Sequence, residues 1–272
     1  MSELPHPAKT SQVGLLYDEM HELYVAALGD NLHAGFFDGA LDTSPLEGAQ
    51  ERLTQMMMER LALQPQQQML DVGCGSGRPA LRLARESGAR VLGISVSLTQ
   101  VQSANLRAAT EGLSERVQFR LADVQLLPLP DATFDAAWAL ESLLHVESRP
   151  RALAEIWRVT KPGARLAIAD VTADMPLEPD ELAELVSAFR LGSLCSLEQY
   201  VAEVEAAGFR VLGAQDIGAN TLPTLRAVAR RMSSLKERWP SAKLDAFVRS
   251  FAQLGRLRRK LGYLLLAAER SG

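Results

Sequence analysis

Cysteine is scarce in this chain: only Cys74 and Cys195 occur among 272 residues, which excludes a disulfide framework. Neither cysteine belongs to a spacing typical of metal ligands, so we expect no metal site. No apolar run approaches the roughly 18 residues that a membrane-spanning helix needs. The first ten residues contain two prolines and no apolar stretch, which argues against a signal peptide. We therefore expect a soluble, cytoplasmic protein.

An excess of one charge is also lacking. The 29 Lys and Arg residues nearly balance the 33 Asp and Glu residues, and the net charge is −4. No global positive field would draw the chain to nucleic acid, so we expect a small-molecule partner. Basic residues do gather near the C-terminus, either as solvated helix faces or as a site for an anionic group: Arg226, Arg230, Arg231, Arg256, Arg258, Arg259 and Lys260.

Strand-like and helix-like segments alternate through the chain. Amphipathic stretches with helical spacing separate short apolar runs, which we expect to be strands, at 68–72, 91–94, 117–121, 134–140, 165–169, 210–216 and 263–268. This alternation predicts βαβ units and an α/β fold: a Rossmann-like, seven-stranded, mostly parallel sheet with helices on both faces. Such a sheet binds its ligand beyond the carboxyl ends of the strands.

The same pattern divides the chain into regions. Residues 1–67 contain two amphipathic helices and are expected to form an N-terminal helical cap. Residues 68–175 are expected to form the core of the sheet. After the fifth strand, residues 176–207 are expected to be an inserted helical lid, and residues 208–272 return to the sheet and add helices on the substrate side.

A glycine-rich turn follows the first strand, in the stretch Leu70-Asp71-Val72-Gly73-Cys74-Gly75-Ser76-Gly77. Two details argue against a dinucleotide pyrophosphate as its ligand. The third glycine follows the second by two residues, whereas the dinucleotide fingerprint needs three. Asp71 precedes the turn, where its negative charge would oppose a pyrophosphate and would suit a ligand with an ammonium group. A nicotinamide-dependent oxidoreductase is therefore disfavoured.

This stretch resembles the first motif of class I S-adenosylmethionine (SAM)-dependent methyltransferases. In that family the glycines let the backbone approach the amino-acid part of SAM, and the aspartate orients it. Ala122-Asp123-Val124 resembles the segment whose acid and following backbone hold the adenine ring. The resemblance implies SAM as cofactor, with S-adenosylhomocysteine (SAH) as product, bound by Tyr17, Asp71, Gly73, Gly75, Gly77, Ser95, Gln100, Asp123, Val124 and Leu140.

One departure narrows the resemblance. The second strand of most such enzymes ends in an acid that binds both ribose hydroxyls, whereas this chain has Ser95 there. The subgroup that methylates natural-product sugars, macrolides and polyketides shares the serine, and in it a glutamine matched by Gln100 helps hold the ribose. Tyr17-Asp18 in the first helix resembles a segment that folds over SAM. The chain is therefore similar to natural-product O-methyltransferases, a resemblance that leaves a monomer and a homodimer both open.

Methyl transfer to an alcohol requires alignment of the acceptor and removal of one proton, for which histidine is the favoured base. His145 stands just past the fourth strand, and we predict that it is the general base, oriented by Asp170 at the end of strand five. The related sugar enzymes carry two adjacent histidines here, whereas this chain has Leu144 before His145. His33, in the loop after the first helix, is a further candidate for contacting the acceptor, with a turn-stabilising role as the alternative.

These residues predict a SAM-dependent methyltransferase acting on a hydroxyl of a small secondary metabolite of glycosylated or polyketide type. The alternative keeps SAM but methylates carbon or nitrogen of a prenyl, quinone, sterol or heteroaromatic substrate. The acceptor itself is not determined by the sequence, because its pocket is built from the parts that the resemblance constrains least.

Overall fold

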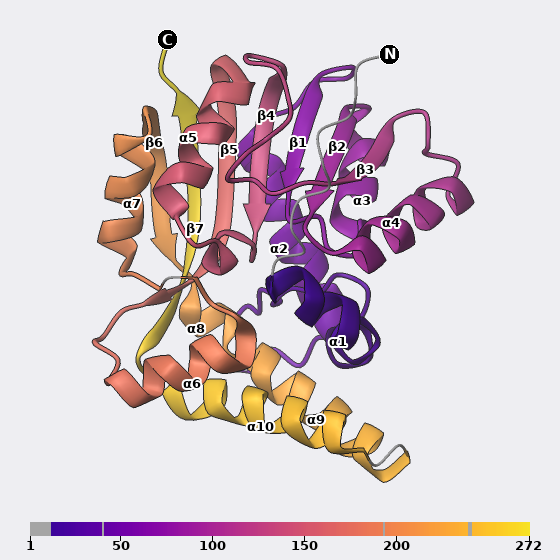
Figure 1. The fold of residues 1–272 in the computed structure, drawn as a ribbon, viewed down its shortest axis with the longest axis vertical. Helices are drawn as coiled ribbons and strands as arrows, with labels where there is room; N and C mark the ends of the chain where they lie inside the picture. Colours follow the sequence, from indigo (N-terminus) through magenta and orange to yellow (C-terminus); the bar gives the residue numbers. More distant parts are fainter. Residues whose placement is uncertain (1–11, 40, 193, 239–240) are drawn as a thin grey trace.

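A seven-stranded sheet with the order β3-β2-β1-β4-β5-β7-β6 forms the centre of the protein (Figure 1). The computed structural model describes the chain in four stretches: 12–39, 41–192, 194–238 and 241–272. The strands are β1 (Gln68–Val72), β2 (Arg90–Ser95), β3 (Val117–Leu121), β4 (Phe134–Leu140), β5 (Thr160–Ala173), β6 (Phe209–Asp216) and β7 (Leu261–Arg270). Only β7 runs against its neighbours β5 and β6, so the expected mostly parallel sheet is confirmed.

Helices cover both faces of the sheet, as predicted. On one face lie α2 (Leu46–Leu61), α3 (Arg78–Ser87) and α4 (Leu98–Thr110), whose buried apolar side chains pack in one cluster with Trp138. On the other face lie α5 (Arg149–Val159) and α7 (Leu197–Ala206). Each face thus has its own apolar core, and the loops at the carboxyl ends of the parallel strands are left free to form a site.

A helical layer lies across the carboxyl edge of the parallel strands, below the sheet in Figure 1. It consists of α1 (Gln12–Leu28), α6 (Pro179–Phe189), α8 (Gly218–Thr221), α9 (Pro223–Arg238) and α10 (Ala242–Leu257). Buried side chains of α1, α9 and α10 pack around Tyr24, whose ring meets Phe247 edge-on at 4.9 Å between centroids. Of the described helices, every one is too short or too polar to span a bilayer.

The region expected as a lid, 176–207, divides in the structure. α6 packs on α10 in the helical layer, close to the carboxyl edge. α7 instead lies on a face of the sheet against β6 and α5, with Tyr200 and Val204 fully buried. The expected N-terminal cap divides similarly, since α1 lies over the edge whereas α2 covers a face.

Short or paired elements depart most from the sequence prediction. The 3₁₀ turn η1 (Leu143–His145) and α8 were not predicted, because a single turn is too short to show a period. β5 was expected over 165–169 but extends to Ala173, since its last residues pair with β7. The proline of Trp239-Pro240 predicts a break between two helices, and these two residues lie outside those that the structure describes.

Gly77 shows why the glycine turn tolerates little change. Its φ is +79°, and a Cβ there would lie 2.7 Å from Phe119 Cζ and 2.9 Å from Ala104 Cβ. The backbone of the turn therefore presses directly on β3 and α4, which sets how closely α3 approaches the sheet.

We expect Gly77→Ala to lower the free energy of unfolding in urea by about 1–3 kcal/mol, through overpacking and a strained φ. Gly48 in α2 is the matched control, because no atom lies within 4 Å of a Cβ added there. Gly48→Ala should raise the stability by about 0.5–1 kcal/mol. Equal effects of the two substitutions would contradict the packing role of Gly77.

Candidate functional site

Two adjoining cavities lie at the carboxyl edge of the sheet. The larger, about 630 Å³, is lined by the glycine turn and by the ends of β1, β2 and β4. The smaller, about 180 Å³, lies against the helical layer and is lined mostly by apolar side chains. Both cavities are lined by Tyr17, Leu32, Glu141, His145 and Leu191, which thus form a shared wall.

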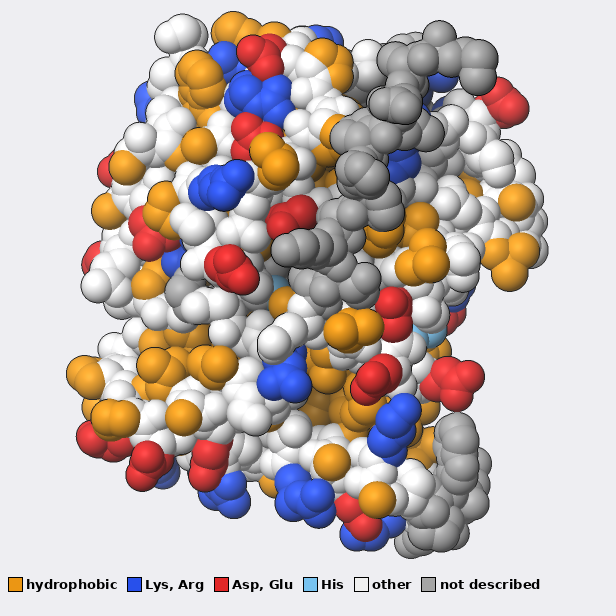
Figure 2. All heavy atoms as spheres, in the orientation of Figure 1, with side chains coloured by type: hydrophobic (Ala, Val, Ile, Leu, Met, Phe, Trp, Pro, Cys, Tyr) orange, Lys and Arg blue, Asp and Glu red, His pale blue; other side chains and the backbone are white. Residues whose placement is uncertain are grey.

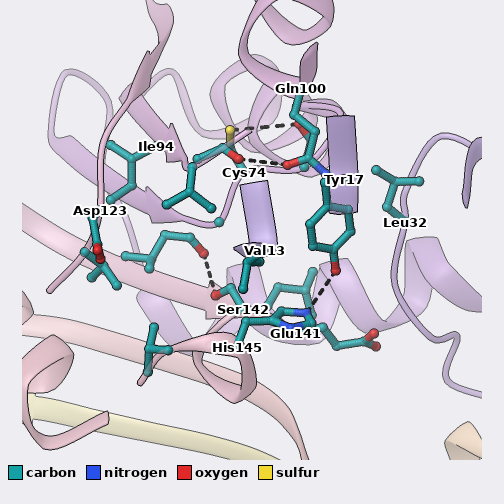
Figure 3. Close-up of a pocket in the computed structure, with 18 of the residues that line it drawn as sticks. Val13, Tyr17, Leu32, Cys74, Ile94, Gln100, Asp123, Glu141, Ser142 and His145 are labelled. Carbon is teal, nitrogen blue, oxygen red and sulfur yellow. Dashed lines mark hydrogen bonds between the residues drawn. The ribbon is translucent and has the colours of Figure 1, made fainter. Parts of the chain in front are cut away.

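The larger cavity gathers the residues predicted to bind SAM (Figure 3). Gly77 is the exception, since it packs against the sheet instead of lining the cavity. The residues that line it come from α1, the glycine turn, β2, α4, the loop after β3, and β4: Tyr17, Asp71, Gly73, Gly75, Ser95, Gln100, Asp123, Val124 and Leu140.

Ser95 and Gln100 form a hydrogen-bonded pair at the position where the resemblance expects a ribose-binding acid. The Ser95 hydroxyl donates to Gln100 Oε1 at 2.8 Å and accepts from the backbone N–H of Ser97 at 3.1 Å. The Gln100 amide nitrogen has no partner within the described stretches. It is therefore available to donate to a ribose hydroxyl oxygen.

Asp71 is a buried carboxylate that faces the cavity from the end of β1. Trp138, directly opposite on β4, donates its indole N–H to Oδ1 at 2.7 Å. Burial raises the pKa of Asp71 from 3.8 to about 7, although the indole N–H partly opposes this. A buried carboxylate with one neutral donor is suited to a cation, and an ammonium group such as that of SAM supplies one.

The helix α1 is fixed over the larger cavity by its polar contacts. Asp18 accepts from the hydroxyl of Ser97 at 2.5 Å and from the backbone N–H of Thr99 at 3.0 Å, at the N-terminus of α4. Asp18 thereby satisfies a backbone N–H that the first turn of α4 leaves without a partner. Its negative charge also lies at the positive end of the α4 dipole, which is stabilising. This places Tyr17, the next residue, above the cavity.

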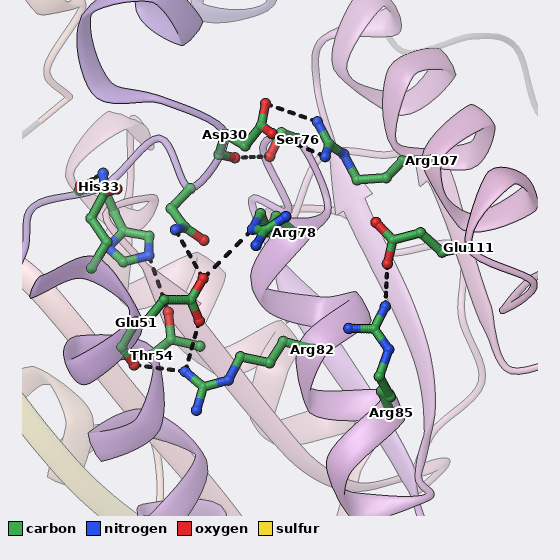
Figure 4. A network of polar contacts seen from close by, with 12 residues as sticks. Asp30, His33, Glu51, Thr54, Ser76, Arg78, Arg82, Arg85, Arg107 and Glu111 are labelled. Carbon is green, nitrogen blue, oxygen red and sulfur yellow. Dashed lines mark hydrogen bonds and ion pairs between the residues drawn. The ribbon is translucent and has the colours of Figure 1, made fainter. Parts of the chain in front are cut away.

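The loop after α1 is pinned to the glycine turn by the network in Figure 4. The Ser76 hydroxyl donates to the carbonyl oxygen of Asp30, and Arg107 forms an ion pair with the Asp30 carboxylate at 2.9 Å. Nearby, Glu51 of α2 forms ion pairs with Arg82 at 2.9 Å and with Arg78 at 3.5 Å. Hydrogen bonds and ion pairs therefore connect the N-terminal region to the glycine turn and to the helices that follow it.

His33 lines the larger cavity, but both of its ring nitrogens are occupied. Nδ1 donates to the carbonyl oxygen of Ala34 at 2.6 Å, and Nε2 lies 3.2 Å from the Thr54 hydroxyl. Burial lowers the pKa of His33 to about 4, so the ring is neutral. These contacts favour a turn-stabilising role over contact with the acceptor.

His145 lies on the wall shared by the two cavities. The Tyr17 hydroxyl donates to its Nε2 at 2.9 Å (Figure 3), and Nδ1 lies 3.4 Å from the carbonyl oxygen of Arg190. Burial lowers the pKa of His145 to about 4, so a neutral ring presents its Nε2 lone pair to the cavities. The segment after α6 can approach the residue next to His145 because it has a glycine there: a Cβ on Gly192 would lie 1.7 Å from the Val146 carbonyl oxygen.

Asp170 does not contact His145, and it lines neither cavity. Its carboxylate is fully buried and accepts from the Tyr200 hydroxyl at 3.0 Å. Burial raises the pKa of Asp170 to about 7, although the guanidinium of Arg149 partly opposes this. Because β5 continues past Asp170, this residue lies within the strand and points towards α7. The geometry does not support the expected role of orienting His145.

Glu141 was not among the residues predicted for the site, and the structure places it on the shared wall. It follows β4 directly and has a φ of +49°, which few residues other than glycine adopt. Oε1 accepts from the Ala34 backbone N–H at 2.6 Å and from the Tyr263 hydroxyl at 2.7 Å. An acid just past the end of a strand at the ligand edge was the sequence signal for it.

The C-terminal basic residues are mostly exposed and several form ion pairs. Lys260 contacts Glu181 at 2.6 Å, and Arg231 contacts Glu47. Figure 2 shows Lys and Arg side chains scattered among acidic ones along the helical layer. Most of these residues therefore lie on solvated helix faces, and Arg258 is the exception because it lines the smaller cavity. No cluster of metal-ligating side chains occurs in the described part of the chain.

Comparisons with known proteins agree with this geometry. Residues 70–168 match a family model described as a methyltransferase domain. The methyltransferase GfsG of Streptomyces halstedii is 41% identical over 224 residues, 81% of each chain. The 27-O-demethylrifamycin SV methyltransferase of Amycolatopsis mediterranei is 37% identical over 270 residues, 96% of this chain and 97% of the relative. The crystal structure of the [4+2]-cyclase SpnF covers 99% of both chains with a TM-score of 0.85 and 33% identity.

Asp71 should make SAH binding depend on pH. At pH 6 the free protein holds Asp71 mostly protonated, so binding of the SAH ammonium should release close to one proton. Calorimetric titrations in two buffers of different ionisation enthalpy measure this release. Asp71→Asn should abolish the release and weaken SAH binding roughly ten- to a hundred-fold. Asp170→Asn is the control and should keep it, whereas an unchanged release in Asp71→Asn would contradict the assignment.

In the absence of ligand, the free energy of unfolding should depend on pH through the same ionisation of Asp71. The pKa of Asp71 is raised to about 7 on folding, so the unfolded chain ionises first as the pH rises. The contribution of Asp71 to the free energy of unfolding therefore falls as the pH rises from about 4 to 7. Saturating SAH should reduce this fall, as followed by urea denaturation.

Proposed function

Because the chain belongs to the class I SAM-dependent methyltransferases, we propose that it methylates a hydroxyl of a small secondary metabolite of polyketide or glycosylated type. The observation that carries this proposal is the shared wall, where a neutral histidine separates the predicted cofactor cavity from an apolar one. A base at this boundary is placed where an acceptor oxygen would meet the methyl group.

The smaller cavity supports an apolar acceptor. Its lining away from the shared wall is dominated by aliphatic and aromatic side chains of the helical layer, including Leu28, Leu185, Phe189, Phe251 and Leu254. Burial of an apolar skeleton against these side chains would hold one hydroxyl at the polar wall. A relative named as a methyltransferase of 27-O-demethylrifamycin SV supports an oxygen acceptor on a small molecule.

His145 serves as the base in this proposal. Bound SAM supplies a methyl group on a positively charged sulfur. The bond from that methyl carbon to sulfur would break and leave SAH as the acceptor oxygen bonds to the carbon. The hydroxyl proton would pass to His145 Nε2, with the acceptor hydroxyl in the position that the Tyr17 hydroxyl now holds. The Arg190 carbonyl oxygen, 3.4 Å from Nδ1, favours the tautomer with the proton on Nδ1, in which the Nε2 lone pair accepts from a hydroxyl.

Three outcomes of one assay distinguish the candidate functions. The protein is incubated with SAM and a panel of hydroxylated polyketides that includes 27-O-demethylrifamycin SV, and SAH and product masses are followed. A product with one added methyl on oxygen, located by NMR, supports the proposal. A methyl on carbon or nitrogen supports the alternative acceptor classes, such as prenyl or heteroaromatic substrates. An isomer of unchanged mass would favour cyclisation, the second candidate given by the 33% identity to the [4+2]-cyclase.

His145→Ala should leave SAH affinity unchanged and slow turnover by roughly 10²-fold or more, because the proton then has no positioned acceptor. Calorimetry with SAH and single-turnover assays with the best acceptor of the panel measure the two effects. His21 lines neither cavity, so His21→Ala is the control and should retain normal turnover. Near-normal turnover of His145→Ala would show that the acceptor loses its proton without this base.

A further inference from the structure

Glu141 holds an unusual position on the shared wall. It is the first residue after β4, four residues before His145, and its backbone N–H donates to the Ala169 carbonyl oxygen at 2.8 Å. Its φ of +49° turns the side chain out of the alternation of the strand. Such conformations in residues other than glycine gather at functional sites, so the outlier calls for an explanation.

The two carboxylate oxygens of Glu141 have different surroundings. Oε1 takes both hydrogen bonds, from the backbone N–H of Ala34 and from the hydroxyl of Tyr263. Oε2 has no hydrogen-bond partner within the described stretches. Protein atoms do not fully enclose it either. Because Glu141 lines both cavities, Oε2 is an acceptor that a ligand can reach.

Glu141, His145 and Tyr17 lie together on the shared wall. The Tyr17 hydroxyl donates to His145 Nε2. Burial raises the pKa of Tyr17, and the nearby charge of Glu141 adds to this. In Figure 3 the side chains of Glu141 and His145 both lie below the Tyr17 ring, with the Glu141 carboxylate directed away from the imidazole. Because Glu141 and His145 line the same two cavities, an acceptor hydroxyl at Nε2 would lie on the wall that Glu141 also lines.

We propose that Glu141 is a specificity-determining residue, whose Oε2 accepts a hydrogen bond from a second hydroxyl on the carbon next to the methylated one. This inference rests on the proposed function, because it assigns the acceptor as a vicinal diol in an otherwise apolar molecule. Oε1 and its two donors fix the carboxylate in place, so little side-chain entropy is lost when the diol binds.

The partner of Oε2 is a neutral hydroxyl and not an ammonium group. Bound SAM already brings a positive charge to the adjoining cavity, and a second cation nearby would be repelled. A hydroxyl can donate to Oε2 without adding charge. A carboxylate acceptor strengthens such a bond relative to one between neutral groups.

The test uses binding to the full-length protein saturated with SAH, so that no turnover is needed. The probes are 1,2-octanediol and 2-octanol, which share an apolar chain and differ by the second hydroxyl. The wild-type protein should bind the diol roughly ten-fold more tightly or more, since a hydrogen bond to a charged group is involved. Equal affinities, or binding of neither probe, would overturn the proposal.

Glu141→Gln separates recognition from anchoring. The amide oxygen can still accept from Ala34 and Tyr263, while an NH₂ group replaces the acceptor Oε2. This variant should lose the preference for the diol and keep its affinity for 2-octanol and for SAH. The matched control Tyr263→Phe removes one anchoring bond but keeps Oε2, so it should retain the preference. If Glu141 only anchored its neighbours, Glu141→Gln would leave the binding of the two probes as in the wild-type protein, and Tyr263→Phe would change it.

Failure of this inference is distinguishable from failure of the proposed function. The diol preference is measured at equilibrium, whereas the proposed function is tested by methylated product. A protein that methylates a mono-alcohol and ignores the diol would refute only the role of Glu141.

Discussion

The docking of α1 and its following loop on the carboxyl edge of the sheet is the contact on which both cavities depend. Asp18 holds α1 on the N-terminus of α4, and the Asp30 carbonyl oxygen accepts from Ser76 in the glycine turn. Farther along, the Ala34 N–H is bound by Glu141. Without these contacts the edge would be an open crevice, like that of any parallel sheet. With these contacts, α1 and its loop cover the edge, carry Tyr17 and separate the two cavities.

The burial that α1 and its loop provide also sets the electrostatics of the site. Burial raises the pKa of Asp71 and Glu141 and lowers that of His145, so the site disfavours charge in the absence of ligand. A cationic cofactor reverses this balance, since it stabilises both carboxylates as anions while leaving a neutral histidine as base. Cofactor binding and the chemistry at the wall are therefore coupled through charge.

The sequence identified those parts of the site that local pattern encodes. The strand, glycine turn and Asp71 lie within ten residues, and their order alone places them at the ligand edge. The direction of Asp170 could not be predicted in this way. Pairing with β7, almost a hundred residues later, extends β5 beyond Asp170 and turns its side chain towards α7. The positive φ of Glu141 likewise depends on contacts with Ala34 and Tyr263, which are distant in sequence.

The position of sulfur in a crystal structure of the protein with bound SAH tests the central claim most directly. The claim is that the methyl group crosses the wall between the two cavities, beside Tyr17 and His145. We expect the sulfur at that wall, facing the apolar cavity, with the ammonium group on Asp71 and the ribose beside Gln100. A sulfur that faces away from His145, or an SAH molecule bound outside the larger cavity, would contradict the account.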